Sequence, residues 1–224
     1  SSGGRFASNG SGTGMIQAVV FDVFGTLLQI DERRHPFRQL MQHLRLQGRT
    51  PRPDDARTLM TRNLGLAGAA DYFGAQLSNS ELASLESDLF TELASVRLFD
   101  DALESLNQLK NAGLKLALCS NLAAPYAIPA KLLLPSFDVY GWSFEVGAIK
   151  PEPAIYRQMI EQLGCEASAI AMIGDTLQAD MLGPIGQGMR GYHLQREGKA
   201  DQCGFVSLMD FAAHVLQYPP SVNG

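Results

Sequence analysis

The stretch VVFDVFGTLL, residues 19–28, is the part of this sequence that decides its fold. It continues the apolar run IQAVVFD (16–22), which is short and rich in β-branched residues. Such a run is typical of a strand that is buried on both faces of a parallel sheet. The run ends at Asp22, a Gly-Thr turn follows, and Phe24 stands two residues after the acid. An acid at this place either closes the turn or faces a ligand beyond the end of the strand.

Helical and strand patterns alternate after Arg97. The helical stretches are DDALESLNQLKNAG (100–113), PAIYRQMIEQLG (153–164) and SLMDFAAHVL (207–216), and the strand stretches are LKLALCSN (114–121), AIAMIGD (169–175) and RGYHLQ (190–195). Amphipathic helices that alternate with short strands predict βαβ units. The sequence therefore predicts an α/β protein with an open parallel sheet covered by helices.

The segment before Arg97 interrupts this pattern and is predicted to be mostly helical. Two stretches carry apolar side chains at helical spacing, PFRQLMQHLRL (36–46) and SELASLESDLFTEL (80–93). Ser80 is the expected N-cap of the second helix, because acidic residues follow it in the first turn. Loops are expected at GRTPRPDD (48–55) and around GLAGAADYFG (65–74).

These patterns predict a core domain that is interrupted by a helical insert. The core is expected to comprise residues 15–30 and 97–224, and the insert residues 31–96. Residues 1–14 (SSGGRFASNGSGTG) are low in complexity, and the first Met is Met15. We expect that segment to be a disordered, tag-like tail.

Composition and charge exclude several classes of protein. The net charge of −5 argues against a broad nucleic-acid footprint, so no nucleic-acid partner is expected. No apolar run approaches the roughly 20 residues of a membrane helix, and no secretion signal is recognisable, so no membrane partner is expected. The three cysteines lack metal-ligand spacing and are expected to be reduced thiols of a cytoplasmic protein. Monomer and homodimer both remain open.

Polar residues stand where three of the predicted strands end. Asp22, Ser120 and Asp175 each follow or close an apolar run, and Lys150 lies in a loop rich in glycine and proline. Taken singly, each residue has an ordinary explanation as a turn, a cap or a solvated side chain. If the strands are neighbours, however, these side chains meet at the carboxyl edge of the sheet, where ligands bind. Two carboxylates at one place favour a hard divalent cation.

This ordered set of motifs resembles the haloacid dehalogenase superfamily of aspartate-nucleophile hydrolases. DVFGTLL (22–28) is similar to its first motif, LALCSN (116–121) to its second, VGAIKPEPAIY (146–156) to its third and MIGDTLQAD (172–180) to its fourth. The resemblance implies a Rossmann-like parallel-sheet core, with an α-helical cap domain inserted between the first two motifs. It also implies a small anionic molecule as the substrate and Mg²⁺ as the cofactor.

The resemblance also implies a role for each motif residue. Asp22 would be the nucleophile that forms an aspartyl-phosphate. Ser120 would donate a hydrogen bond to the phosphoryl oxygens, and Lys150 would offset the negative charge of the nucleophile and the phosphate. Asp180 would support Lys150 or the waters of the metal. Phosphate or substrate binding is implied for Thr26, Ser120, Asn121 and Lys150, with the Asn121 N–H at a helix start. Magnesium is implied to touch Asp22, the main-chain oxygen of Phe24, and Asp175.

Phe24 is the main departure from the family pattern. Most phosphatases of this family carry there a second Asp that protonates the leaving alcohol, a function typically worth about 10²–10⁴-fold in rate. Three interpretations stay open. The first is a magnesium-dependent phosphohydrolase, and the third is a catalytically silent binding protein. The second is a metal-independent 2-haloacid dehalogenase, because such enzymes carry an aromatic residue at this place and Tyr156 also suits that group. Dehalogenases have neutral Ser and Asn where this chain has Asp175 and Leu177, so the phosphohydrolase ranks first.

Overall fold

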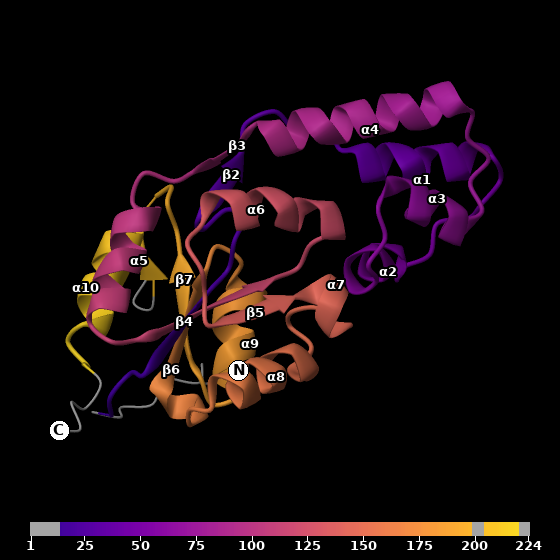
Figure 1. The fold of residues 1–224 in the computed structure, drawn as a ribbon. Coiled ribbons are helices and arrows are strands. Elements are labelled where there is room, and N and C mark those ends of the chain that lie inside the picture. Colours follow the sequence, from indigo (N-terminus) through magenta and orange to yellow (C-terminus); the bar gives the residue numbers. More distant parts are fainter. Residues whose placement is uncertain (1–13, 199–203, 220–224) are drawn as a thin grey trace.

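A six-stranded parallel sheet forms the centre of the computed structural model, which describes residues 14–198 and 204–219 (Figure 1). Its strand order is β5-β4-β1-β6-β7-β8. The strands are β1 (Ala18–Phe21), β4 (Lys115–Ser120), β5 (Val139–Trp142), β6 (Ile170–Gly174), β7 (Arg190–Leu194) and β8 (Gly204–Phe205). The predicted α/β class with an open parallel sheet is confirmed, and β1 lies between β4 and β6.

Both faces of β1 are buried, as the continuous apolar run predicts. Val19 and Phe21 pack with α5 (Ala102–Asn111), α6 (Ala127–Leu133) and α10 (Leu208–Val215) on one face of the sheet. Ala18 and Val20 pack with α8 (Pro153–Leu163) on the other. Successive side chains of a strand point to opposite faces, so a strand covered on both sides must be apolar at every position.

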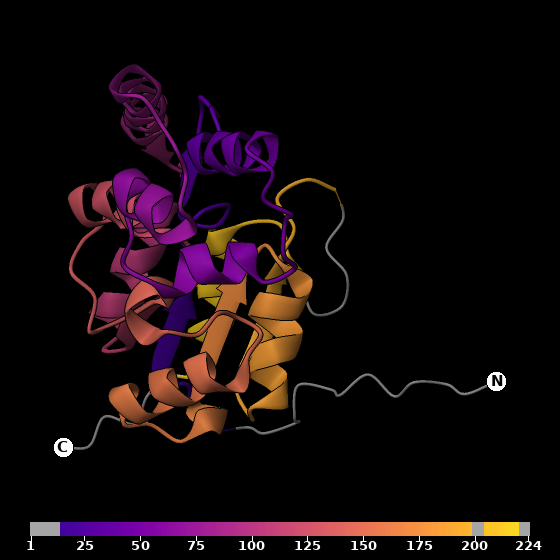
Figure 2. The ribbon, with the colours of Figure 1, turned by 90° about the vertical axis from the view of Figure 1, so that its right-hand side faces the viewer.

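The insert begins and ends in a small antiparallel pair of strands, β2 (Leu28–Ile30) and β3 (Val96–Leu98). Between them run α1 (Pro36–Leu46), α2 (Asp55–Thr61), α3 (Leu66–Phe73) and α4 (Asn79–Ala94). These helices share a hydrophobic core of their own, with Leu40, Leu66 and Leu85 at its centre. In Figure 1 they lie together at one end of the molecule, beyond the sheet, and Figure 2 shows this end facing the viewer. A helical insertion between β1 and β4 is therefore confirmed, whereas its boundaries at 31 and 96 stay a prediction.

Several short helical elements lie in the connections after β4, near the carboxyl edge of the sheet or between its strands. They are a 3₁₀ turn, η1 (Ala124–Tyr126), the helical turn α7 (Ser143–Val146), a second 3₁₀ turn, η2 (Ala167–Ala169), a π-helical turn, η3 (Leu177–Leu182), and α9 (Gly183–Gly186). A π-turn carries one extra residue per turn, and such turns are frequent at functional sites.

Two local predictions for the insert are wrong. Residues 66–73 form helix α3 and not a loop, because Leu66, Ala69 and Ala70 recur at helical spacing and are buried. Helix α4 begins earlier than expected, and its N-cap is Ser78 in place of Ser80. The Ser78 hydroxyl accepts from the Glu81 N–H, and the Glu81 carboxylate accepts from the Ser78 N–H. This reciprocal capping box satisfies two of the free donors at the helix start.

Two further expectations meet the structure only in part. In the part of the chain that is described, no helix has the length and apolarity needed to cross a bilayer. Cys119 and Cys165 are free thiols. Cys203 and the predicted tail up to residue 13 lie outside the described residues.

Candidate active site

The carboxyl edge of the sheet brings the predicted polar residues together. Asp22 follows β1, Ser120 closes the neighbouring strand β4, and Asp175 follows β6 on the other side. Ser120 is buried, and the carboxylates of Asp22, Asp175 and Asp180 offer oxygens within 4.8 Å of one another. The expected convergence at the strand ends is therefore confirmed, since the strands that carry these residues are neighbours.

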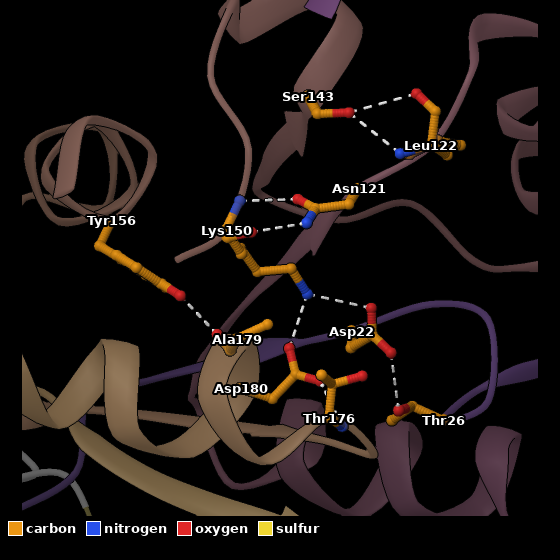
Figure 3. A network of polar contacts seen from close by, with 10 residues as sticks. All are labelled: Asp22, Thr26, Asn121, Leu122, Ser143, Lys150, Tyr156, Thr176, Ala179 and Asp180. Atoms are coloured by element: carbon orange, nitrogen blue, oxygen red, sulfur yellow. Dashed lines mark hydrogen bonds and ion pairs between the residues drawn. The ribbon is translucent and has the colours of Figure 1, made fainter. Parts of the chain in front are cut away.

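Asp22 lies at the centre of the cluster (Figure 3). Its Oδ2 accepts a hydrogen bond from the Thr26 hydroxyl at 3.1 Å, and its Oδ1 accepts one from Lys150 Nζ at 3.1 Å. The Asp22 N–H donates to the Ile173 carbonyl of β6. The Gly-Thr turn after Asp22 therefore folds back to hold the carboxylate, which fixes its orientation.

Lys150 is the cation of the site and is almost fully buried. Its Nζ donates to Asp180 Oδ1 at 2.6 Å as well as to Asp22 (Figure 3). Asn121 holds its main chain from both sides, since Asn121 Oδ1 accepts from the Lys150 N–H and Asn121 Nδ2 donates to the Lys150 carbonyl. The loop after α7 thus delivers the ammonium to the sheet edge.

Asp180 is fully buried on the π-turn η3. Its second oxygen accepts from the Thr176 N–H at 3.0 Å, so both oxygens are engaged (Figure 3). Tyr156 contacts the same turn, where its hydroxyl donates to the Ala179 carbonyl at 2.5 Å. In this structure Asp180 therefore contacts Lys150, which is one of the two supports that the resemblance implied for it.

Burial and mutual repulsion set the electrostatics of the cluster. Burial raises the pKa of Asp22 to about 6, with a smaller raising effect from Asp175 that opposes the lowering effect of Lys150. Burial likewise raises the pKa of Asp180. Burial alone would lower the pKa of Lys150, but Asp22 and Asp180 together outweigh it. The pKa of Lys150 therefore lies well above its usual value. Lys150 thus pairs with two of the three acids, Asp22 and Asp180, and a further cation would relieve the repulsion among the three carboxylates.

The residues at this edge fit a hard divalent cation. Asp175 is exposed and opens the cluster to solvent, while Asp22 and Asp180 lie deeper. Oxygen ligands are the donors that such ions prefer. Gly25 has a φ of 87°, and a Cβ there would collide with the Asp175 carboxylate. Only glycine lets the turn after β1 come so close to Asp175.

Asn121 differs from its expected setting. The segment after Ser120 is not helical at once, because η1 begins only at Ala124. The Asn121 N–H is therefore not at a helix start, and the side chain of Asn121 instead positions Lys150. The next residue, Leu122, is held by the buried Ser143 hydroxyl, which contacts both its N–H and its carbonyl (Figure 3).

Phe24 faces a cavity between the insert and the core. The cavity has a volume of about 370 Å³, and Phe24, Asn121 and Tyr126 line it from the core side. Phe24 packs edge-to-face on Tyr126, with ring centroids 6.2 Å apart. At the position where a second acid would stand, the chain thus has Phe24, whose ring forms part of the cavity wall.

Sequence reasoning missed two residues that join the insert to the core. Glu92 is fully buried in the last turn of α4, and its Oε1 accepts from the Tyr126 hydroxyl at 2.6 Å. Its Oε2 accepts from the N–H groups of Arg34 and His35, which lead into α1. Glu92 follows Leu85 and Leu89 at helical spacing, so its place on the buried face was readable. Tyr126 carried no comparable signal.

Comparisons with known sequences agree with this arrangement. A family model described as haloacid dehalogenase-like hydrolase matches residues 16–186. The phosphoglycolate phosphatase of Rhodospirillum rubrum is 32% identical over 129 residues, or 54% of this chain and 51% of that protein. The ribulose-1,5-bisphosphate 5-phosphatase of Halopiger xanaduensis is 32% identical over 101 residues, or 43% of this chain and 42% of that protein. The chain thus spans about half, or less, of the length of these curated relatives.

Solved structures show the same architecture over nearly the whole chain. The crystal structure of a HAD phosphatase from Thermococcus onnurineus has a TM-score of 0.64 at 25% identity, covering 92% of this chain and all of that one. The L-2-haloacid dehalogenase of Xanthobacter autotrophicus has a TM-score of 0.59 at 21% identity, covering 90% and 99%. The second likeness establishes the fold alone. Both proteins share the core and the inserted helices with this chain.

Proposed function

This chain belongs to the haloacid dehalogenase-like hydrolase family, and from that premise we propose that it is a magnesium-dependent phosphohydrolase that works through an aspartyl-phosphate on Asp22. The observation that carries the proposal is the cluster of the Asp22, Asp175 and Asp180 carboxylates, two of which, Asp22 and Asp180, pair with the ammonium of Lys150. The substrate is a small phosphorylated molecule. Relatives named as phosphatases, such as the Rhodospirillum rubrum protein, support this choice.

The proposed reaction has two steps. A carboxylate oxygen of Asp22 forms a bond to phosphorus while the bond from phosphorus to the leaving oxygen breaks. Water then attacks the phosphorus of the aspartyl-phosphate and releases inorganic phosphate together with the free carboxylate. Thr26 and Lys150 hold the Asp22 carboxylate in place before the first step.

Charge neutralisation is the task of the surrounding residues. Lys150 offsets the negative charge of Asp22 and of the incoming phosphoryl group, and Asp180 fixes the position of its ammonium. Ser120 and Asn121 are proposed to bind the phosphoryl oxygens. Asp22, Asp175 and the main-chain oxygen of Phe24 would hold Mg²⁺, which supplies positive charge to the phosphoryl oxygens when bound.

The second candidate is a metal-independent 2-haloacid dehalogenase, favoured by Phe24. A halide leaves without a proton, so a dehalogenase needs no general acid at position 24 and an aromatic residue there does not slow its reaction. Two observations weigh against it. Asp175 adds a third carboxylate near the site of an anionic haloacid, and the Tyr156 hydroxyl is taken up by the Ala179 carbonyl. A silent binding protein ranks third, since every charged motif residue except the general acid is present.

One assay separates the three candidates. The purified chain is incubated with an aryl phosphate and with 2-chloropropionate, each in the presence of magnesium or of EDTA. We expect phosphate release that requires magnesium and no chloride release. Chloride release that persists in EDTA would select the dehalogenase, and no release from either compound would favour the silent protein.

A further inference from the structure

The cavity between the insert and the core has a composition that restricts the substrate. We propose that it binds the leaving group of the phosphate ester, and that this group is an aryl or enol oxygen whose carbon skeleton carries a carboxylate. The inference rests on the proposed function and names the substrate class of the same site. Three features of the cavity support it: its walls, its charges and its lack of an acid.

The walls of the cavity are largely aromatic and aliphatic. Phe24 and Phe37 flank Tyr126 from the core and the insert, each with its ring centroid 6.2 Å from that of Tyr126. Ile30, Leu59, Met60 and Leu122 add aliphatic surface. A planar unsaturated group packs well against such rings, whereas a polyhydroxylated sugar would leave its hydroxyl groups without partners.

Tyr126 adds no free hydroxyl to these walls. Its O–H donates to Glu92 at 2.6 Å, and burial, followed by Glu92, raises the pKa of Tyr126 above its usual value. Glu92 itself is fully buried and accepts from Tyr126 and from two main-chain N–H groups. Neither residue is therefore free to protonate a leaving oxygen in the cavity.

The charges on the cavity are positive. Arg33 and Arg38 line it from the insert, and none of the described lining residues carries a carboxylate. Neither Arg33 nor Arg38 has an ion pair or side-chain hydrogen bond with any described residue. Arg34, Arg49 and Arg57 of the insert are paired with carboxylates, whereas Arg45 is, like Arg33 and Arg38, without such a pair among the described residues. Two unpaired guanidinium groups beside an apolar cavity are suited to a carboxylate of the ligand, which they can bind in bidentate fashion.

The missing acid at position 24 determines the kind of leaving oxygen. An alkoxide is a poor leaving group unless it is protonated, but a phenolate or enolate is a stable anion. Esters of such oxygens leave far more readily than alkyl esters from a cavity that presents Phe24 in place of a carboxylic acid. The aromatic walls and the missing carboxylic acid at position 24 thus point to the same class of compound.

The test compares matched compounds on the full chain with magnesium. The substrates are phenyl phosphate, 4-carboxyphenyl phosphate and benzyl phosphate. The variants are the double substitution Arg33→Gln/Arg38→Gln and, as control, Arg45→Gln, an exposed arginine of α1 that does not line the cavity. Binding of phenylphosphonate and 4-carboxyphenylphosphonate, which cannot be hydrolysed, is measured by calorimetry in parallel.

We expect the wild type to prefer 4-carboxyphenyl phosphate over phenyl phosphate in kcat/KM by about tenfold, equivalent to roughly 1.4 kcal/mol. Benzyl phosphate is expected to be the poorest of the three. The double variant should lose the preference for the carboxylate, in turnover and in phosphonate binding, while Arg45→Gln keeps it. An equal loss on all three esters, or no carboxylate preference in the wild type, would overturn the proposal.

Two further results separate this proposal from the function on which it rests. Selective binding of the carboxylated phosphonate without any phosphate release would support the cavity assignment and contradict the phosphohydrolase. His35 also lines the cavity, so His35→Asn is included. If that variant slowed benzyl phosphate far more than phenyl phosphate, His35 would be supplying a proton, and the restriction to aryl and enol esters would be wrong.

Discussion

Phe24 connects the chemistry of the site with the shape of the cavity above it. Its position in the turn after Asp22 would otherwise suit a second acid, and its ring instead forms an edge-to-face pair with Tyr126. The metal role proposed for residue 24 needs only a main-chain oxygen, which any residue provides. A single side chain thus removes proton donation and leaves the proposed metal ligands in place.

Replacement of Phe24 tests whether the missing acid limits turnover. We expect Phe24→Asp to raise the kcat of benzyl phosphate hydrolysis by about tenfold or more, since a positioned acid contributes about 10²–10⁴-fold. Phenyl phosphate should gain little, because its leaving group needs no proton. Phe24→Asn is the matched control, as it has a similar shape and no acidic proton. Equal gains for Asp and Asn would show that space, and not acidity, was limiting.

At the scale of single elements, α4 fastens the insert to the core. Its last turn places Glu92 between the Tyr126 hydroxyl of η1 and the N–H groups of Arg34 and His35. His35 has a φ of 54°, in the left-handed region that non-glycine residues adopt infrequently. The carboxylate therefore satisfies two main-chain donors at a bend that leads directly into α1.

Removal of this carboxylate should destabilise the protein. We expect Glu92→Ala to lower the free energy of unfolding by about 1–3 kcal/mol, because the N–H groups and the Tyr126 hydroxyl lose their acceptor. Glu86→Ala, at an exposed position of the same helix, is the control and should stay within about 0.5 kcal/mol. Urea unfolding measures both. Similar values for the two variants would mean that Glu92 does not fasten the insert.

An ion pair within the insert makes the stability of the protein depend on pH. Arg49 binds Asp55 through two hydrogen bonds of 2.7 and 2.8 Å and lowers the pKa of Asp55 from 3.8 to about 2. Since the folded state holds this carboxylate in its charged form, the stabilisation is complete above pH 4 and is lost as the pH falls towards 2.

The corresponding variant makes this contribution measurable. Asp55→Asn should reduce the free energy of unfolding by about 1–2 kcal/mol at pH 6, and the difference from wild type should shrink as the pH falls below 4. Asp54→Asn, at the exposed neighbouring position, serves as control. Unfolding curves recorded between pH 3 and pH 7 provide the test. A difference that stays constant over this range would show that the ion pair does not control the stability of the insert.

At the scale of the whole molecule, the core was readable from the sequence because its signals are local. The apolar run before Asp22 and the alternation of helices and strands after Arg97 predicted the parallel sheet. The acidic residues at the ends of the predicted strands indicated the acid cluster. Strand β5 and the elements around it carry no strong pattern, and they were not predicted. Helix α3, predicted as a loop, is short and lies between Gly65 and Gly74, and its helical signal is confined to the buried Leu66, Ala69 and Ala70.

Contacts between distant segments were beyond a reading of one sequence. The bond between Glu92 and Tyr126 joins residues 34 positions apart, on the insert and the core. The cavity likewise depends on how the insert packs over Phe24, which no local pattern determines. The sequence thus led to the shared chemistry of the site, whereas the features that restrict its substrate required the structure.

The central claim is that the carboxylate of Asp22 takes up the phosphoryl group, and trapping that adduct tests it most directly. The protein is mixed with phenyl phosphate and magnesium, quenched in acid within one turnover and digested for mass spectrometry. We predict a phosphoryl group on Asp22 that is absent in EDTA and absent from Asp22→Asn, which should also release no phosphate. Phosphate release by Asp22→Asn at the wild-type rate would contradict the account. So would a 1-carboxyethyl ester on Asp22, formed from 2-chloropropionate in EDTA with loss of chloride.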